Sequence, residues 1–121
     1  MPLLPTQIGR AAEYLVCHIL ECYGIEAHHL NSTTDVLAVV ASGRVIRLEV
    51  KAANPRGGYG SYRFLSNNKG KSDYYAFVAF DQSRVIFIPS DRVVGITMTI
   101  AQNQFTPERQ HATLAILGEL T

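Results

Sequence analysis

The chain has 121 residues, of which 47% are hydrophobic and 17% charged. These figures predict one globular domain over residues 1–121 and exclude disordered, collagen-like and coiled-coil proteins. The formal net charge is only +1, but residues 44–71 hold seven basic residues and one acid, so this segment either binds a polyanion or forms a solvated loop. No apolar run approaches the roughly 18 residues of a membrane span, and residues 1–6 do not resemble a secretory signal, so we expect a cytoplasmic protein.

The first expected element is a helix that begins with Thr6 as its N-cap and ends at about residue 23, where Gly24 caps its C-terminus. Apolar residues recur along it at three- and four-residue spacing and form one stripe. Glu13 lies at the edge of this stripe rather than on the solvated side of the helix. Cys17 and Cys22 fall on different faces, so we expect two free thiols.

Strand patterns follow over residues 25–30, 35–41 and 45–51, and the last two form a hairpin around residues 42–44. Apolar and polar residues alternate in the third run, so Glu49 and Lys51 share its polar face. A two-residue turn at residues 42–43 would place Asp35 opposite Val50 and away from Glu49. A three-residue loop or a bulge, with Gly43 at positive φ, would instead place Asp35 opposite Lys51 and bring the polar side chains together.

Residues 52–72 are rich in glycine and basic residues and include Tyr59, Tyr62 and Phe64. We expect a long functional loop here, because the glycines make a regular helix unfavourable. Two more strands are expected over residues 74–80 and 84–89, and a weaker one over residues 95–100. Thr106 and Pro107 mark the start of a last helix that ends at about residue 117. The order predicts an α/β domain with a central mixed β-sheet flanked by helices.

Asp35, Glu49 and Lys51 form a residue set that suits phosphodiester hydrolysis. Two carboxylates can hold Mg²⁺ and leave sites for water and a phosphate oxygen, and the metal then positions or acidifies that water. The lysine can orient the water, accept its proton or hold the phosphate. A Glu-x-Lys pair on an exposed strand is also common as solubilising charge, so both interpretations remain open. The four histidines of the chain lack zinc-site spacing.

The segments Gly9–Glu13, Asp35–Ala38 and Leu48–Lys51 resemble the PD-(D/E)xK nuclease superfamily. Residues 71–78 and 85–89 are similar to the branch with archaeal-type Holliday junction resolvases and small intron-encoded homing endonucleases. This resemblance implies a restriction-endonuclease-like core and a Mg²⁺- or Mn²⁺-dependent DNA endonuclease. It implies Asp35 and Glu49 as metal ligands, Lys51 at the attacking water, and Glu13 as an auxiliary ligand. It also implies a homodimer without a small-molecule cofactor.

Four cations follow the Glu-x-Lys strand closely and are expected to contact the DNA phosphate backbone: Arg56, Arg63, Lys69 and Lys71. The aromatic residues between them can stack on bases or pack locally. One alternative is a non-catalytic nucleic-acid-binding module on the same fold, and another is a structural or partner-binding domain in which Glu-x-Lys is incidental. The sequence leaves open whether the substrate is a branched junction, a specific duplex site, nicked or single-stranded DNA, or RNA.

Overall fold

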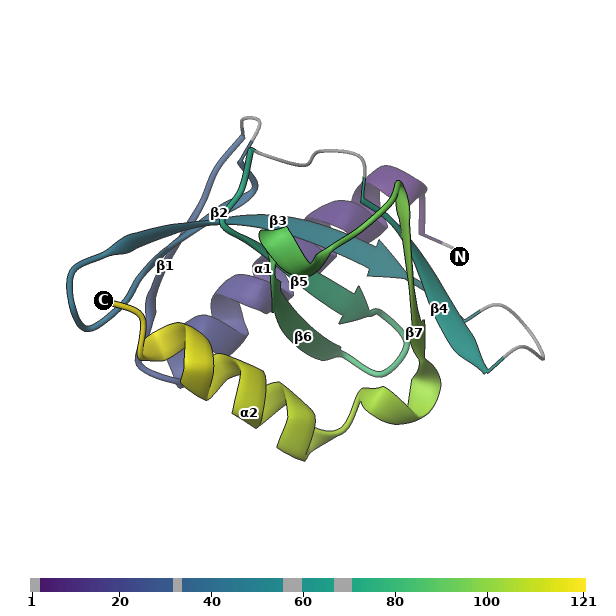
Figure 1. Cartoon of the computed structure of the whole chain (residues 1–121). Helices are drawn as coiled ribbons and strands as arrows, with labels where there is room; N and C mark the ends of the chain where they lie inside the picture. Colours follow the sequence, from purple (N-terminus) through teal and green to yellow (C-terminus); the bar gives the residue numbers. More distant parts are fainter. Residues whose placement is uncertain (1–2, 32–33, 56–59, 67–70) are drawn as a thin grey trace.

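The computed structural model describes residues 3–31, 34–55, 60–66 and 71–121. Its helices and strands follow most of the segments that the sequence predicts (Figure 1). In chain order they are α1 (Pro5–Cys22), β1 (Glu26–His29), β2 (Val36–Val39), β3 (Val45–Ala53), β4 (Ser61–Leu65), β5 (Tyr74–Ala79), β6 (Arg84–Pro89), η1 (Ser90–Arg92), β7 (Thr97–Ala101), η2 (Gln102–Gln104) and α2 (Pro107–Gly118).

Five strands form one sheet in the order β1-β2-β3-β5-β6. All neighbours are antiparallel except β3 and β5, which run parallel. Every residue of β5 is buried, as expected of a central strand with both faces covered. The α/β class and the central mixed sheet that the sequence predicts are therefore confirmed.

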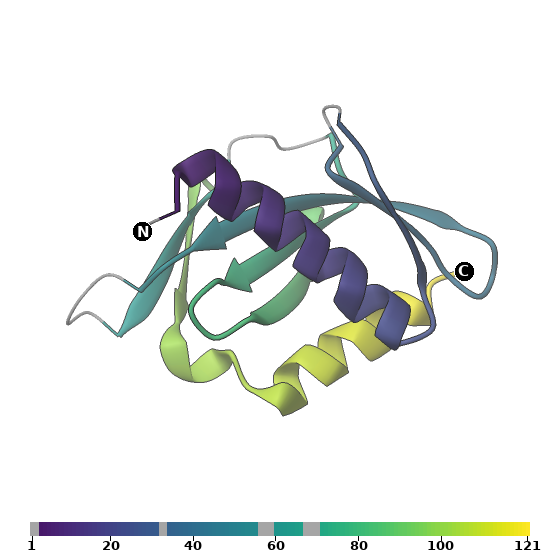
Figure 2. The ribbon, with the colours of Figure 1, turned by 180° about the vertical axis from the view of Figure 1, so that it is seen from behind.

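The two faces of the sheet carry different layers. Both helices contribute to one hydrophobic cluster, which includes Val16 of α1, Leu48 of β3 and Leu114 of α2. Figure 2 shows α1 lying across this face of the sheet. A second cluster on the opposite face includes Tyr75 and Phe77 of β5 and is covered by β4 and β7. None of the described helices is both long and apolar enough to span a membrane.

The predicted loop over residues 52–72 contains β4, so this part of the prediction was wrong. β4 pairs antiparallel with β7, and the two strands form a separate two-stranded sheet, which we call the ribbon (Figure 1). Tyr62 and Phe64 are buried beneath it, so they pack locally and are not exposed for base stacking. The alternation of apolar and polar residues in β4 is short. Its partner strand lies about 35 residues further along the chain, so the sequence has no hairpin pattern that would predict β4.

Local capping decides where the helices begin and end. The expected N-cap Thr6 lies inside α1, because Pro5 occupies the first turn and the backbone N–H of Leu4 donates to Oε1 of Gln7 at 2.8 Å. The C-terminal end behaves as predicted, since Gly24 has a φ of +84°. Thr106 is also confirmed as a cap, because its hydroxyl accepts from the backbone N–H of Arg109 at 3.1 Å.

Asp73 fixes the parallel alignment of β5 against β3. Its Oδ2 accepts from the backbone N–H of Arg47 at 2.8 Å, and the Arg47 guanidinium lies 3.3 Å from its Oδ1. The backbone N–H of Asp73 in turn donates to the carbonyl of Arg47 at 2.8 Å. Burial raises the pKa of Asp73, but the hydrogen bonds from Arg47 outweigh burial and hold that pKa below its ordinary value.

We predict that Asp73→Asn lowers the free energy of unfolding at pH 7 and that this loss disappears in acid. A lowered folded-state pKa means that the unfolded chain binds more protons. The stability from Asp73 is therefore present above the ordinary carboxyl pKa and is lost as pH falls through the lower folded-state value. Urea titrations at pH 7 and about pH 3 measure the difference. Asp91→Asn, on the exposed η1, is the control, and an equal deficit at both pH values would contradict this account.

Candidate active site

The β2–β3 hairpin brings Asp35 next to the Glu-x-Lys pair. The register pairs Val39 with Val45 and Val36 with Leu48, and one further step along the ladder places Asp35 opposite Glu49. The loop consists of three residues, 41–43, with Gly43 at a φ of +89°. The three-residue loop and the role of Gly43 are confirmed. The predicted pairing of Asp35 with Lys51 was wrong by two positions, because the loop begins one residue earlier than expected.

The Asp35 carboxylate is bound to the neighbouring strand. Its Oδ2 accepts from the backbone N–H of Val50 at 2.9 Å, and its own N–H donates to the carbonyl of Leu48 at 3.2 Å. The carboxylate thus acts as the acceptor for one backbone N–H at the end of the β2–β3 ladder. This contact holds the carboxylate beside the segment that carries Glu49 and Lys51.

Glu49 and Lys51 lie on the face of the sheet that the ribbon covers. In the parallel register Glu49 is paired with Tyr75 and Lys51 with Phe77, both in the second core cluster. Glu49 is only 5% exposed, and its Oε2 lies 3.5 Å from Nζ of Lys51. A carboxylate this deeply buried is stable only beside positive charge or strong donors, so the lysine is part of what allows it to be there.

Glu13 belongs to α1, which packs on the other face of the sheet, and it approaches Asp35 from there. Its Oε1 lies 2.6 Å from Nε2 of His29, and the ring of Tyr14 stacks on His29 with centroids 4.6 Å apart. Burial is the main cause that raises the pKa of Glu13, and the negative charge of Asp35 raises it further, against the opposing effects of His29 and Arg10. The two carboxylates are therefore close enough to repel one another.

A cavity of about 370 Å³ contains Glu13 and Asp35. The residues that line it come from α1, the end of β1 and the start of β2: Thr6, Gly9, Arg10, Glu13, His29, Leu30, Asn31 and Asp35. Glu49 and Lys51 are not among these lining residues. The structure thus groups the predicted residues as two adjoining pairs, joined by the hydrogen bond between Asp35 and the backbone of Val50.

The part of the chain that the structure describes contains no group of three or more His, Cys, Asp and Glu residues that could hold a metal ion. A divalent cation here would rely on two carboxylates. Mg²⁺ binds proteins in this way, since it retains several waters and uses one or two carboxylates together with substrate phosphate. The donor set is all oxygen, which suits Mg²⁺ or Mn²⁺ rather than a thiolate-binding metal.

Two residues of the cavity were missed from the sequence. His29 has no zinc-site spacing in the sequence, and Arg10 appears there only as part of the Gly9–Glu13 segment, but both line the cavity. A signal for His29 existed, because it ends the strand next to the one that Asp35 begins. The backbone N–H of Leu30 donates to the carbonyl of Asp35 at 2.9 Å, so the two strand ends must meet.

The cations predicted to bind DNA have different positions. Arg63 lies on the exposed side of β4, and Lys71 is exposed just before β5. Arg56 and Lys69 lie outside the described residues, so their predicted role stays a prediction.

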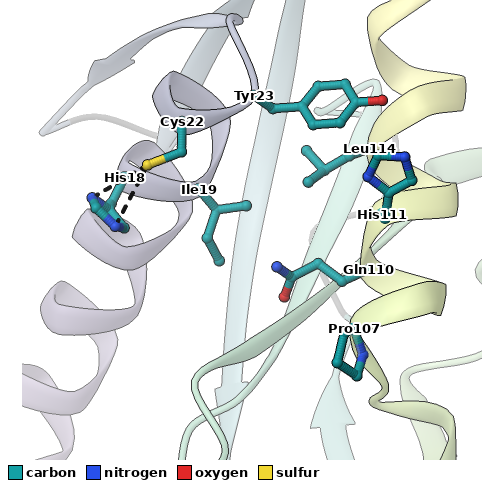
Figure 3. Close-up of a pocket in the computed structure, with 8 residues that line it drawn as sticks. All are labelled: His18, Ile19, Cys22, Tyr23, Pro107, Gln110, His111 and Leu114. Carbon is teal, nitrogen blue, oxygen red and sulfur yellow. Dashed lines mark hydrogen bonds between the residues drawn. The ribbon is translucent and has the colours of Figure 1, made fainter.

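A second groove, of about 300 Å³, lies between α1 and α2 (Figure 3). Its lining is apolar and aromatic with a few polar groups, and it includes Ile19, Tyr23 and Leu114. The thiol of Cys22, a free cysteine, lies 3.7 Å from Nε2 of His18 on one wall, and His111 is on the other. None of the described residues that line this groove is an aspartate or a glutamate, so the groove is separate from the candidate active site.

No protein-family model matches the chain, and no curated protein matches its sequence. The fold is similar to the solved structure of a bacterial homing endonuclease, I-Ssp6803I, with a TM-score of 0.75. The match covers 94% of this chain and 91% of that chain, with 15% identical residues. The similarity shows that the chain has a nuclease-like α/β fold. Membership of the PD-(D/E)xK superfamily stays a prediction from the motifs.

We predict that Asp35→Ala destabilises the fold by about 1–3 kcal/mol, because it leaves the backbone N–H of Val50 without an acceptor. Asp35→Asn keeps an oxygen at that position and is expected to cost much less. Urea unfolding of both variants at pH 7 measures the difference, with Asp91→Ala as the control. An equal loss in the two Asp35 variants would show that the charge, and not the hydrogen bond, matters for stability.

Proposed function

We propose that the protein is a metal-dependent endonuclease that hydrolyses DNA phosphodiester bonds. The observation that carries the proposal is the hairpin register, which places Asp35 opposite Glu49 with Lys51 on the same face of β3. The similarity of the fold to a homing endonuclease supports it. We propose a homodimer as the active form, acting at branched junctions or specific sites.

Asp35 and Glu49 would hold Mg²⁺ or Mn²⁺. The carboxylates of Glu13 and Asp35 repel one another in a partly buried cavity, and a bound cation would relieve that repulsion. When bound, the metal would neutralise charge on the phosphate and lower the pKa of a water. Glu13, whose carboxylate is held in place by His29, would be an auxiliary outer ligand and not one of the two direct carboxylates.

Lys51 would act on the attacking water. Its Nζ is close to Glu49 and its side chain is mostly buried, so the ammonium group has a restricted position. It can orient a water or hold a phosphate oxygen from there. Arg10 lines the cavity beside Glu13 and offers a second cation for the phosphate backbone.

We predict Mg²⁺- or Mn²⁺-dependent cleavage of at least one member of a panel of supercoiled plasmid, linear duplex, four-way junction and single-stranded DNA. Glu49→Gln and Asp35→Asn should reduce the rate by about 100-fold or more through weaker metal binding. Lys51→Ala should reduce it by about 10²–10⁴-fold, as for loss of a general acid or base. Calorimetric titration with Mn²⁺ should show weaker binding for the two carboxylate variants, whereas Lys51→Ala should retain Mn²⁺ binding.

Glu119→Gln and Arg109→Ala are the matched controls, since both change a charge on or near α2, away from the site, and should cleave like the wild type. Cleavage that persists in excess chelator, or in all three site variants, would refute the mechanism. Salt-dependent DNA binding without cleavage in either metal would instead support a non-catalytic nucleic-acid-binding module.

A further inference from the structure

The ribbon has one buried and one exposed face. Its buried face carries the aromatic and apolar residues that pack on the sheet. Its exposed face carries three short polar residues, one arginine, one leucine and one alanine, which pair across the two strands as Ser61 with Ala101, Arg63 with Thr99, and Leu65 with Thr97. None of the described β4 and β7 residues on this face is an acid. Within the described residues Arg63 makes no hydrogen bond or ion pair, so its guanidinium is available to a ligand.

Buried side chains anchor the ribbon to the sheet. Tyr62 is fully buried, its hydroxyl donates to Oδ1 of Asp81 at 2.5 Å, and it accepts from Nε2 of Gln82 at 2.7 Å. Phe64 packs on Phe77 with ring centroids 4.9 Å apart. Side chains on the opposite, exposed face are therefore presented from a fixed backbone, as recognition of a specific ligand requires.

The position of the ribbon relates it to the candidate active site. β4 follows β3 in the chain and contacts it (Figure 1). The ribbon covers the same face of the sheet on which Glu49 and Lys51 lie. A duplex bound at the active site would thus have the ribbon beside it. The major groove of B-DNA is wide enough to admit a two-stranded β-ribbon.

We propose that the exposed face of the ribbon enters the major groove of duplex DNA and reads its sequence. Arg63 would recognise a guanine through O6 and N7, Thr97 and Thr99 would contact neighbouring base edges, and Leu65 would pack on a thymine methyl group. Arg63 then contributes to specificity through a base contact and not through a phosphate contact. The proposal names the specificity element of the proposed nuclease and rests on duplex DNA being its ligand.

Selection from a randomised duplex library tests the proposal without relying on cleavage. The Lys51→Ala protein serves as the background, and it is compared with the same protein carrying Arg63→Ala or Arg63→Gln. The background should select a consensus that includes a G·C pair. Arg63→Ala should lose that preference by about tenfold to a hundredfold at one base pair, and Arg63→Gln should favour A·T there, because glutamine pairs with adenine.

Affinity for a scrambled duplex, measured against salt, separates base contact from phosphate contact. If Arg63 reads a base, the slope of log affinity against log salt should stay nearly unchanged in Arg63→Ala. A slope reduced by about 0.9 with an unchanged consensus would show a phosphate contact and overturn the proposal. Arg109→Gln, on the exposed side of α2, is the charge-matched control and should alter neither measurement.

Two other results would also overturn the proposal. One is that the background protein selects no consensus. The other is that Arg63→Ala changes the oligomeric state in sedimentation but not the consensus, which would make the ribbon a contact between copies of the chain. A failure of the proposed nuclease activity would appear separately, as absence of metal-dependent cleavage by the wild type.

Discussion

β3 and β5 run parallel in the middle of the sheet, so the chain between them must return from one end of the sheet to the other. That crossover passes over one face and carries β4 with it. Because β4 then pairs with β7, the ribbon covers the face on which Glu49 and Lys51 lie. The bond network between Asp73 and Arg47 sets the alignment of the parallel pair. A slip in this register would displace the ribbon and the site residues together.

The opposite face of the sheet has a different role. α1 packs on it and places Glu13 where β1 ends and β2 begins. His29 and Asp35 come from those strand ends, so three elements meet at one cavity. Asp35 connects the two sides, because it lines the cavity together with Glu13 and its carboxylate accepts a hydrogen bond from the backbone of β3. The candidate active site therefore depends on the edge of the sheet rather than on one element.

We propose catalysis for Glu49 and Lys51 and DNA recognition for Arg63, because these charged side chains differ in burial. Glu49 and Lys51 are mostly buried, and the desolvation cost of a buried ion pair can exceed the attraction between its two charges. Arg63 is exposed on a rigid strand and free to meet a ligand. The buried pair suits chemistry at one phosphate, and the exposed arginine suits recognition of the surrounding duplex. Both come from one continuous stretch of chain around the crossover.

The local elements were largely determined by the sequence. α1, the β2–β3 hairpin, β5, β6 and the Thr106 cap were predicted because periodicity, capping residues and turn residues act over a few positions. The pairing of Glu49 with Lys51 on one face followed from strand alternation alone. The hairpin register, the parallel β3–β5 pairing, the ribbon and the contact of His29 with Glu13 were decided only by the tertiary structure. The parallel pairing, the ribbon and the contact of His29 with Glu13 join residues far apart in the chain, and the possible hairpin registers differ by a shift of one residue. Local sequence preference does not distinguish between such arrangements. The arrangement that buries the apolar face of each strand is the one that forms.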